Sequence, residues 1–284
     1  MGTSFLYWNI NRKSGFEQEI AKLTSKADIN ADILLLVEAS KVDDKEIESL
    51  TGLKRINVNT GIDKELTPRF YSKLSINEFQ LLEVYYTHRI VFARFNKKGS
   101  KEIIIGGLHL PSKLEVNSKT QYKDARQIAA DLKTMKERID IKHNRFLLFG
   151  DFNMNPFEDG MIEPDAFNAV LSTKVSIKEK RTDWYKKFDY FYNPMWSFFG
   201  DRNHNTGAEK IPGTYFLSKT RDTTLTYWNM FDKVIMRPNI MDEFDFSSLK
   251  IIEHNGTESL INDDFSIKKR KFSDHLPITF KLKI

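Results

Sequence analysis

The segment RFLLFGDFNMNPFEDG, residues 145–160, joins an apolar run to a polar turn. Residues 146–149 form a short, continuously apolar run, which predicts a buried β-strand. Gly150 ends the run, and Asp151 and Asn153 follow it directly. Polar residues after a strand most often serve the turn itself. A chemical role for Asp151 and Asn153 therefore depends on which other residues the fold brings beside them.

Apolar runs of the same kind recur along the chain and predict an α/β fold. Further strands are expected at residues 5–8, 33–37, 90–95, 103–108, 231–236 and 276–282, with more antiparallel strands within 69–86. Helical spacing predicts helices at 16–26 and 122–139. Strands interleaved with helices favour a layered α/β sandwich. We expect one domain over residues 1–284, with an inserted surface region around 156–214 that bears on substrate choice.

Most of these runs have a potentially chemical side chain at one boundary. Besides the turn quoted above, the boundary residues are Asn9, Asn11, Glu38, His109, Asp232, Asp274 and His275. Each one alone is more often a capping or hydrogen-bonded boundary residue than a catalyst. Side chains just beyond strand ends of an α/β sheet converge on one crevice, however, and such crevices bind ligands. As a set, these residues therefore predict a site.

The residue types indicate the chemistry of that site. Glu38, Asp151, Asp274 and the amide oxygen of Asn9 are hard oxygen donors, which suit Mg²⁺ or Mn²⁺ better than zinc. Histidines with nearby acids supply proton transfer and stabilisation of an oxyanion. A hard divalent ion flanked by imidazoles is what hydrolysis of a phosphodiester or phosphomonoester requires.

Composition removes several other classes of function. The 284 residues include no cysteine, which excludes a disulfide scaffold, thiol catalysis and cysteine-ligated metals. A formal net charge of +5 mildly favours anionic partners.

We find no phosphate-binding glycine loop, no nucleophile elbow and no dinucleotide fingerprint. No apolar run approaches the roughly 18 residues of a membrane helix, and with no leader pattern a cytoplasmic location is expected.

Six blocks of the sequence also resemble a known superfamily. In chain order they are YWNIN, ILLLVEAS, GGLHLP, LLFGDFNMNP, WNMFDKVIMRP and FSDHLPITFKL, running from near the N-terminus to residue 282. They are similar to the endonuclease/exonuclease/phosphatase superfamily, whose members include deoxyribonuclease I, exonuclease III, sphingomyelinases and inositol polyphosphate 5-phosphatases. The resemblance implies a four-layer α/β sandwich with two central mixed β-sheets flanked by helices.

The resemblance also implies the metal ligands and the residues that bind substrate. Glu38 would be the principal metal carboxylate, with Asn9 and Asn11 lining the metal site and Asp274 approaching the metal. Asn11 would also face the substrate. Arg89 matches a position that contacts phosphate in the deoxyribonuclease branch.

The remaining assignments concern the reaction itself. Asp151 would orient or deprotonate the attacking water, or touch a second metal, and Asn153 would position the nucleophile and the scissile phosphate. His275, held in its tautomer by Asp232, would hydrogen-bond a phosphate oxygen. His109 would act as an acid or hydrogen-bond donor on the opposite side of the phosphate.

Two positions depart from the superfamily pattern, and one further candidate residue has a second interpretation. Val37 stands where a Gln often precedes the metal Glu, and the inositol-phosphatase signature around Asp232 is absent, which disfavours a 5-phosphatase. Arg126 is a further candidate phosphate contact, though it also suits a residue that anchors a helix.

Nucleic acid is the substrate class that the sequence favours. The basic run IKKRK, residues 267–271, precedes His275 and is expected at the rim of the site. Together with aromatics such as Trp184, Tyr185 and Trp196 it would suit a polyanion that stacks as well as pairs. We therefore expect a Mg²⁺-dependent nuclease acting on DNA or RNA. The alternatives are a lipid or small-molecule phosphodiesterase or phosphatase, and a non-catalytic scaffold on the same fold.

Overall fold

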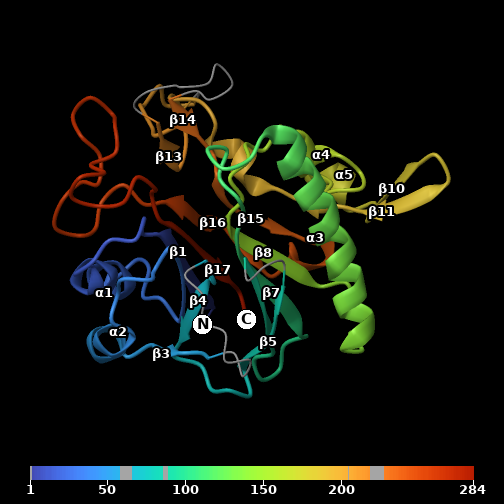
Figure 1. Ribbon diagram of the computed structural model, residues 1–284, viewed down its shortest axis with the longest axis horizontal. Coiled ribbons are helices and arrows are strands. Elements are labelled where there is room, and N and C mark those ends of the chain that lie inside the picture. Colours follow the sequence, from blue (N-terminus) through green and yellow to red (C-terminus); the bar gives the residue numbers. More distant parts are fainter. Residues whose placement is uncertain (1, 58–65, 86–88, 204, 218–226) are drawn as a thin grey trace.

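Two β-sheets form the centre of the molecule in the computed structural model (Figure 1), which describes residues 2–57, 66–85, 89–203, 205–217 and 227–284. The strands of the first sheet are β1 (Thr3–Asn9), β2 (Ile33–Val37), β3 (Lys54–Arg55), β4 (Arg69–Ser72), β16 (Phe244–Ile251) and β17 (Ile278–Leu282). Their order across the sheet is β16-β17-β1-β2-β4-β3.

The second sheet has seven strands. They are β5 (Phe79–Tyr85), β6 (Ile90–Phe95), β7 (Ile103–His109), β8 (Phe146–Asp151), β9 (Ala169–Val170), β12 (Phe191–Tyr192) and β15 (Asp232–Met236). Their order is β5-β6-β7-β8-β15-β12-β9. Both sheets mix parallel and antiparallel neighbours, because β1 with β2 and β7 with β8 are parallel whereas β17 and β15 run against them.

Helices cover the outer faces of the sheets and short hairpins extend from them. The helices are α1 (Glu17–Ser25), α2 (Asp44–Thr51), α3 (Ser118–Arg138), α4 (Asp159–Ile162) and α5 (Thr173–Ser176), with 3₁₀ turns η1 (Pro194–Phe198) and η2 (Pro238–Ile240). The hairpins pair β10 (Lys180–Asp183) with β11 (Lys186–Asp189), and β13 (Tyr215–Phe216) with β14 (Trp228–Asn229). None of the helices within the described residues has the length and apolarity needed to cross a bilayer.

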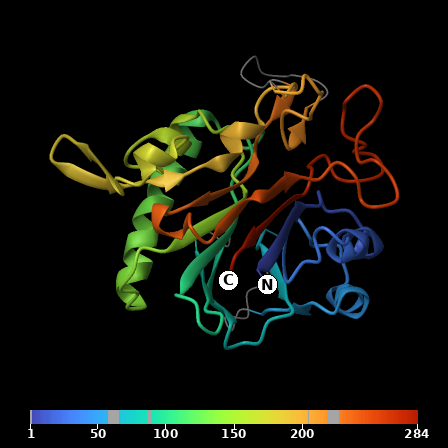
Figure 2. The ribbon, with the colours of Figure 1, turned by 180° about the vertical axis from the view of Figure 1, so that it is seen from behind.

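The alternation of side chains along each strand builds the layers. Successive side chains of a strand point to opposite faces, so Phe5 and Tyr7 of β1 enter the core between the sheets while Leu6 and Trp8 face outward. The outward face of the first sheet packs against α1 and α2, and that of the second packs against α3. Figures 1 and 2 show α1 and α2 at one side of the sheets and α3 at the other. The predicted four-layer sandwich is confirmed.

Each predicted element has a counterpart in the structure, but β16, α2 and several short strands and helices were not expected. Three expected segments also differ from what is observed. The segment expected to hold antiparallel strands passes from β4 in one sheet to β5 in the other. Helix α3 begins at Ser118, ahead of the expected residue 122, because the side chain of Asn117 accepts a hydrogen bond from the backbone N–H of Thr120. The region expected as a surface insertion contributes β9 and β12 to the edge of the second sheet, so only part of it, including the β10-β11 hairpin, projects from the surface.

Candidate active site

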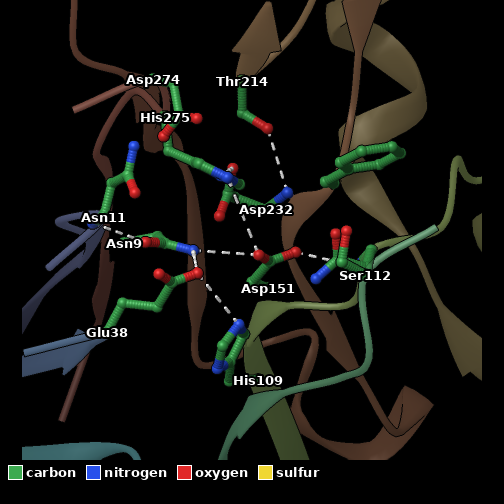
Figure 3. Close-up of polar contacts among 12 residues, drawn as sticks. Asn9, Asn11, Glu38, His109, Ser112, Asp151, Thr214, Asp232, Asp274 and His275 are labelled. Atoms are coloured by element: carbon green, nitrogen blue, oxygen red, sulfur yellow. Dashed lines mark hydrogen bonds and ion pairs between the residues drawn. The ribbon is translucent and has the colours of Figure 1, made fainter. Parts of the chain in front are cut away.

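Strand ends from both sheets meet at one edge of the molecule and carry a polar cluster (Figure 3). In the first sheet Asn9 pairs with Val37 across the parallel strands β1 and β2, so Asn9 and Glu38 leave the sheet together. In the second sheet His109 pairs with Asp151 across the parallel strands β7 and β8. Since parallel strands end at the same edge of a sheet, the two registers bring these four polar side chains to one place.

Antiparallel strands deliver the C-terminal residues to the same edge. Strand β15 begins at Asp232, which pairs with Asp151. His275 lies just before β17, and β17 runs antiparallel to β1. The start of an antiparallel strand lies beside the end of its neighbour, so both residues join the cluster that Figure 3 shows.

The turn after β8 fixes the orientation of Asp151. Gly150 has a φ of 141°, and a Cβ at this position would lie 2.1 Å from the backbone oxygen of Leu108. Asn153, at a φ of 50°, donates its backbone N–H to Oδ1 of Asp151 over 2.8 Å. Oδ2 of Asp151 accepts a hydrogen bond of 3.1 Å from Nδ2 of Asn9. The polar turn is therefore also the device that aims Asp151 at the other sheet.

His275 and Asp232 form a buried pair on one side of Asp151. Nδ1 of His275 lies 2.8 Å from Oδ2 of Asp232, and Oδ1 of the same carboxylate accepts the Tyr7 hydroxyl over 2.7 Å. The backbone N–H of Asp232 donates to Oγ1 of Thr214 over 3.0 Å. With Nδ1 engaged by the carboxylate, Nε2 of His275 faces Asp151, at 3.9 Å from its Oδ2.

Glu38 lies on the other side of the cluster. Its Oε1 is 3.4 Å from Nδ2 of Asn9 and 3.4 Å from Nε2 of His109, while its Oε2 is 3.6 Å from Nε of Arg12. Glu38 adopts a φ of 52°, a conformation that is uncommon for a residue with a side chain and that concentrates at functional sites. Nδ1 of His109 is buried and has no hydrogen-bond partner among the described residues.

Burial and neighbouring charges shift the pKa values of the ionisable groups in the cluster in different directions. Burial alone would lower the pKa of His275, but the charges of Asp232 and Asp151 raise it to about 10. Burial raises the pKa of Asp151, and the charge of Asp232 raises it further. His275 is therefore a cation at neutral pH, and Asp151 is a stronger base than an exposed carboxylate.

Glu38 is shifted in the opposite direction. Burial would raise its pKa, but the hydrogen bond and charge of His109, with the charges of His275 and Arg12, lower it to about 2. The side chain of Glu38 is also 19% exposed, more than those of Asp151 and Asp232. Glu38 is thus a carboxylate that stays ionised and remains open to solvent.

The cluster contains two sets of candidate cation ligands, and the first is the trio Asp151, Asp232 and His275. The ligand atoms of Asp151, Asp232 and His275 all lie within 4.8 Å of one another. Both oxygens of Asp232 are already hydrogen-bonded, however, and a histidine must be neutral to bind a metal. This trio suits proton transfer and anion binding better than metal binding.

The donors on the Glu38 side fit a hard divalent ion. Glu38 and Asp151 provide carboxylate oxygens from the two sheets, of the type that Mg²⁺ and Mn²⁺ prefer. Asn9 turns its Nδ2 toward both carboxylates and its Oδ1 toward the backbone N–H of Asn11, so in this structure it offers the carboxylates a hydrogen-bond donor. Carboxylates held this close repel one another, and a divalent cation relieves that repulsion. The residues present therefore fit the metal that the sequence predicts.

Three other predicted residues lie at the cluster in supporting positions. Asn153 is buried, and its Nδ2 donates to the backbone oxygen of Leu110 over 2.8 Å. Asn11 is exposed, and its backbone N–H donates to Oδ1 of Asn9 over 3.0 Å. Asp274 is half-buried beside His275, whose pKa its charge helps to raise. Their roles toward a substrate remain predictions.

The two predicted arginines have protein partners. Arg89 is buried, and its guanidinium lies 3.4 Å from the backbone oxygen of His109 and 3.2 Å from Oε2 of Glu115. Nε of Arg126 lies 2.6 Å from Oδ2 of Asp165, on the side of α3. Arg89 therefore supports the strand end that carries His109, and Arg126 is placed with α3 instead of with the cluster.

The expected juxtaposition of the basic run with Trp184 and Tyr185 is wrong. Both residues lie in the loop of the β10-β11 hairpin, and Figures 1 and 2 show that hairpin at the opposite end of the molecule from residues 267–271. The aromatic side chain that lines a pocket with the basic run is Phe216 of β13. The hairpin separates from the site because β10 and β11 follow the far edge strand β9 of the second sheet.

The structure adds residues that the sequence did not single out. Tyr7 and Thr214 hold Asp232 through the hydrogen bonds described above. The ring of Tyr215 lies 4.7 Å from that of His275, and Oγ of Ser273 accepts the backbone N–H of His275 over 3.1 Å. A serine whose hydroxyl accepts the backbone N–H two residues later forms a recognised turn, so the role of Ser273 could have been predicted. Partners distant in the chain leave no local signal.

Lys233 is a further unexpected residue, because it is a fully buried lysine beside the acids. Its Nζ donates to the backbone oxygens of Met154, over 2.6 Å, and Phe231, over 2.8 Å. Burial lowers its pKa to about 7, despite the opposing charges of Asp151 and Asp232. The lysine fastens the turn after β8 to the start of β15.

Comparison with known proteins supports the fold. No protein-family model and no curated protein matches the sequence. Solved structures match over nearly the whole chain. A Bacteroides thetaiotaomicron endonuclease/exonuclease/phosphatase family protein is 16% identical, with a TM-score of 0.55 and 99% and 98% of the two chains covered.

Two further structures are similar to the same extent. A truncated Caenorhabditis elegans TDP2 is 15% identical, with a TM-score of 0.56 and 99% and 97% of the chains covered. The 3′ phosphatase NExo from Neisseria, bound to a product DNA hairpin, is 14% identical, with a TM-score of 0.55 and 99% of each chain covered. The chain therefore has the fold of the endonuclease/exonuclease/phosphatase superfamily.

Proposed function

We propose that this protein is a divalent-metal-dependent phosphodiesterase that hydrolyses nucleic acid. The observation that carries the proposal is the arrangement around Asp151, a buried carboxylate with a raised pKa between the charged His275–Asp232 pair and the Glu38–His109 pair. Positive and negative groups at opposite sides of one small site suit a reaction in which a proton is removed while negative charge grows on phosphorus-bound oxygens.

Each side chain has a role that follows from its contacts. Asp151 accepts the proton of the attacking water, since its raised pKa brings it closer to the operating pH. His275 donates Nε2–H to a non-bridging phosphate oxygen, because Asp232 occupies its Nδ1 and keeps the ring charged. His109, across Glu38 from His275, donates toward the leaving oxygen. A divalent cation bound at Glu38 would neutralise charge on the phosphate.

The choice of nucleic acid as substrate rests on charge and on similar structures. The chain carries a formal net charge of +5, and residues 268–271 line a pocket with Phe216. Positive charge beside an aromatic ring suits a phosphate backbone with bases. The similar NExo structure holds a DNA hairpin.

A substrate screen tests the proposal. Labelled single- and double-stranded DNA and RNA are incubated with Mg²⁺ or Mn²⁺, in parallel with a small phosphodiester and a small phosphomonoester. We expect cleavage of at least one nucleic acid, abolished by chelation and lowered by orders of magnitude in His275→Ala. Cleavage of a small ester but of no nucleic acid would reject the nuclease. Cleavage of no substrate would reject the enzyme and favour a scaffold.

A further inference from the structure

The loop of the β10-β11 hairpin consists of two exposed aromatic residues. Asp183 pairs with Lys186, so Trp184 and Tyr185 are the whole loop. Trp184 is 86% exposed and Tyr185 is 97% exposed. Figures 1 and 2 both show the hairpin projecting clear of the body of the molecule. Large aromatic side chains this exposed gain nothing from the core of their own chain.

The backbone of this loop also disfavours the residues that occupy it. Trp184 has a φ of 52°, and a bulky residue at positive φ is a conformational outlier. Two-residue hairpin loops with positive φ at the first position favour glycine there. An aromatic pair at this loop therefore lowers the stability of the hairpin. Residues that conflict with the backbone conformation they occupy are concentrated at functional sites.

A strongly basic groove lies between this hairpin and helix α3. Two adjoining concavities, of about 600 and 680 Å³, share Ala129, Lys133, Lys187 and Phe188. Together they are lined by nine lysines and arginines against four acidic residues, an excess of five positive charges. That excess equals the formal net charge of the whole chain, which is +5. We call these two concavities the hairpin groove.

Many of the cations in the hairpin groove have no acidic partner. Lys123, Lys133, Lys136, Lys186 and Lys187 have no carboxylate oxygen within 4.0 Å among the described residues. Three of the four acids pair with the other cations of the groove, Asp165 with Arg126, Asp189 with Lys180 and Asp140 with Lys142. The charge of the groove is therefore open to an external anion.

We propose that the hairpin groove binds single-stranded nucleic acid, with Trp184 and Tyr185 stacking on unpaired bases and the lysines holding the phosphates. Aromatic platforms beside a basic groove are the combination that such strands require. Trp and Tyr flanked by lysines also suit an anionic membrane. The cations, however, line a concave groove that a flexible strand can enter and a flat bilayer cannot. This site is separate from the Asp151 cluster, and the proposal does not require the protein to be a nuclease.

The test measures binding of a labelled oligothymidylate of about 20 nucleotides, longer than the roughly 4 to 16 nucleotides of one stacking groove. Fluorescence anisotropy is recorded with chelator present, so that no strand is cleaved. The first variant is Trp184→Gly with Tyr185→Asn, which suits the loop better than the natural pair. We expect Kd to rise roughly 5- to 100-fold while the melting temperature stays the same or increases.

A second variant tests the charges and a third is the control. Lys133→Gln with Lys136→Gln should raise Kd and reduce the slope of log Kd against log salt by about 1.4, since each phosphate contact in a single strand contributes about 0.7. Lys45→Gln with Lys98→Gln removes two exposed lysines outside the groove and should change neither quantity.

The outcomes separate this proposal from its rival and from the proposed function. Unchanged oligonucleotide binding in the first two variants overturns the groove. Loss of binding to phosphatidylserine vesicles with unchanged oligonucleotide binding overturns it in favour of a membrane. Hydrolysis of a small phosphodiester is measured in every variant and should be unaffected. If that hydrolysis is absent in the unmodified protein while the binding losses appear, the groove stands and the proposed function fails.

Discussion

Nδ1 of His275 lies 2.8 Å from Oδ2 of Asp232, and both side chains are buried at the junction of the two sheets. The pair links β15 of one sheet to the segment that precedes β17 of the other. It fixes which ring nitrogen of His275 faces Asp151, and it keeps the ring protonated. The orientation and the charge of His275, which we propose binds the phosphate, thus depend on one carboxylate.

Asp232→Asn should therefore impair both catalysis and stability. The amide can still accept the Tyr7 hydroxyl, but it no longer holds His275 as a cation. We expect turnover to fall by about 10²- to 10⁴-fold, measured with the substrate found by the screen, and the pKa of His275 to fall, followed by NMR of the imidazole. Tyr7→Phe is the control, which removes one hydrogen bond and about 1 kcal/mol of stability. A loss below tenfold in Asp232→Asn would contradict the assignment.

The pH dependence of stability provides a second prediction, because two buried cations act in opposite directions. The pKa of His275 is raised from 6.5 to about 10, so its stabilisation is complete below pH 6.5 and is lost as pH rises through 10. The pKa of Lys233 is lowered from 10.5 to about 7, so its contribution makes the protein more stable as pH rises from 7 to 10.5. In the unmodified protein the two slopes largely offset each other.

Single substitutions should reveal each slope. In His275→Gln the free energy of unfolding should increase with pH, and in Lys233→Met it should decrease, each by up to about 1.4 kcal/mol per pH unit. Urea unfolding at several pH values between about 7 and 10 measures both. Parallel pH profiles for the two variants would show that these side chains do not titrate as their surroundings imply.

Glu38→Gln should remove the response of the protein to divalent ions. A ligand that binds only the folded state stabilises it by mass action, by about 2.7 kcal/mol at a concentration a hundred times Kd. We expect Mg²⁺ or Mn²⁺ to raise the melting temperature of the unmodified protein and to leave that of Glu38→Gln unchanged. Glu46→Gln, an exposed change on α2, should behave like the unmodified protein. Equal shifts in all three proteins would place the metal elsewhere.

The sequence predicted which polar residues lie together better than it predicted the strands at the edges of the sheets. Strands β1, β2, β7 and β8 have strong apolar runs, and Asn9, Glu38, His109 and Asp151 lie at or just beyond their ends, so the convergence of these residues could be inferred. The eight-residue strand β16, FDFSSLKI, has no such run and was not predicted. Strands β9 and β12 have two residues each, too few for a periodic pattern, and they form because β15 offers a free edge. Short elements of this kind depend on tertiary contacts and not on local sequence.

Contacts between residues far apart in the chain were also not predicted from the sequence. Tyr7 and Asp232 are 225 positions apart, and no local pattern connects them. Helix α2 was missed for a different reason, since Ile47 is its one buried residue, although Asp43 at its start and Gly52 at its end are ordinary capping signals. Capping residues deserve more weight where the apolar pattern of a helix is weak.

Gly150→Ala should damage the site through the backbone. A Cβ would lie 2.1 Å from the oxygen of Leu108, and the φ of 141° strains any other residue. The neighbouring strand must move, so Asp151 shifts from Asn9 and turnover falls together with stability. We expect a loss of at least about 3 kcal/mol in urea unfolding. Gly256→Ala, also at positive φ but with open space around its Cβ, isolates the strain and should cost about 1 kcal/mol. Equal losses in the two variants would mean that the close approach of β7 and β8 does not hold Asp151 in place.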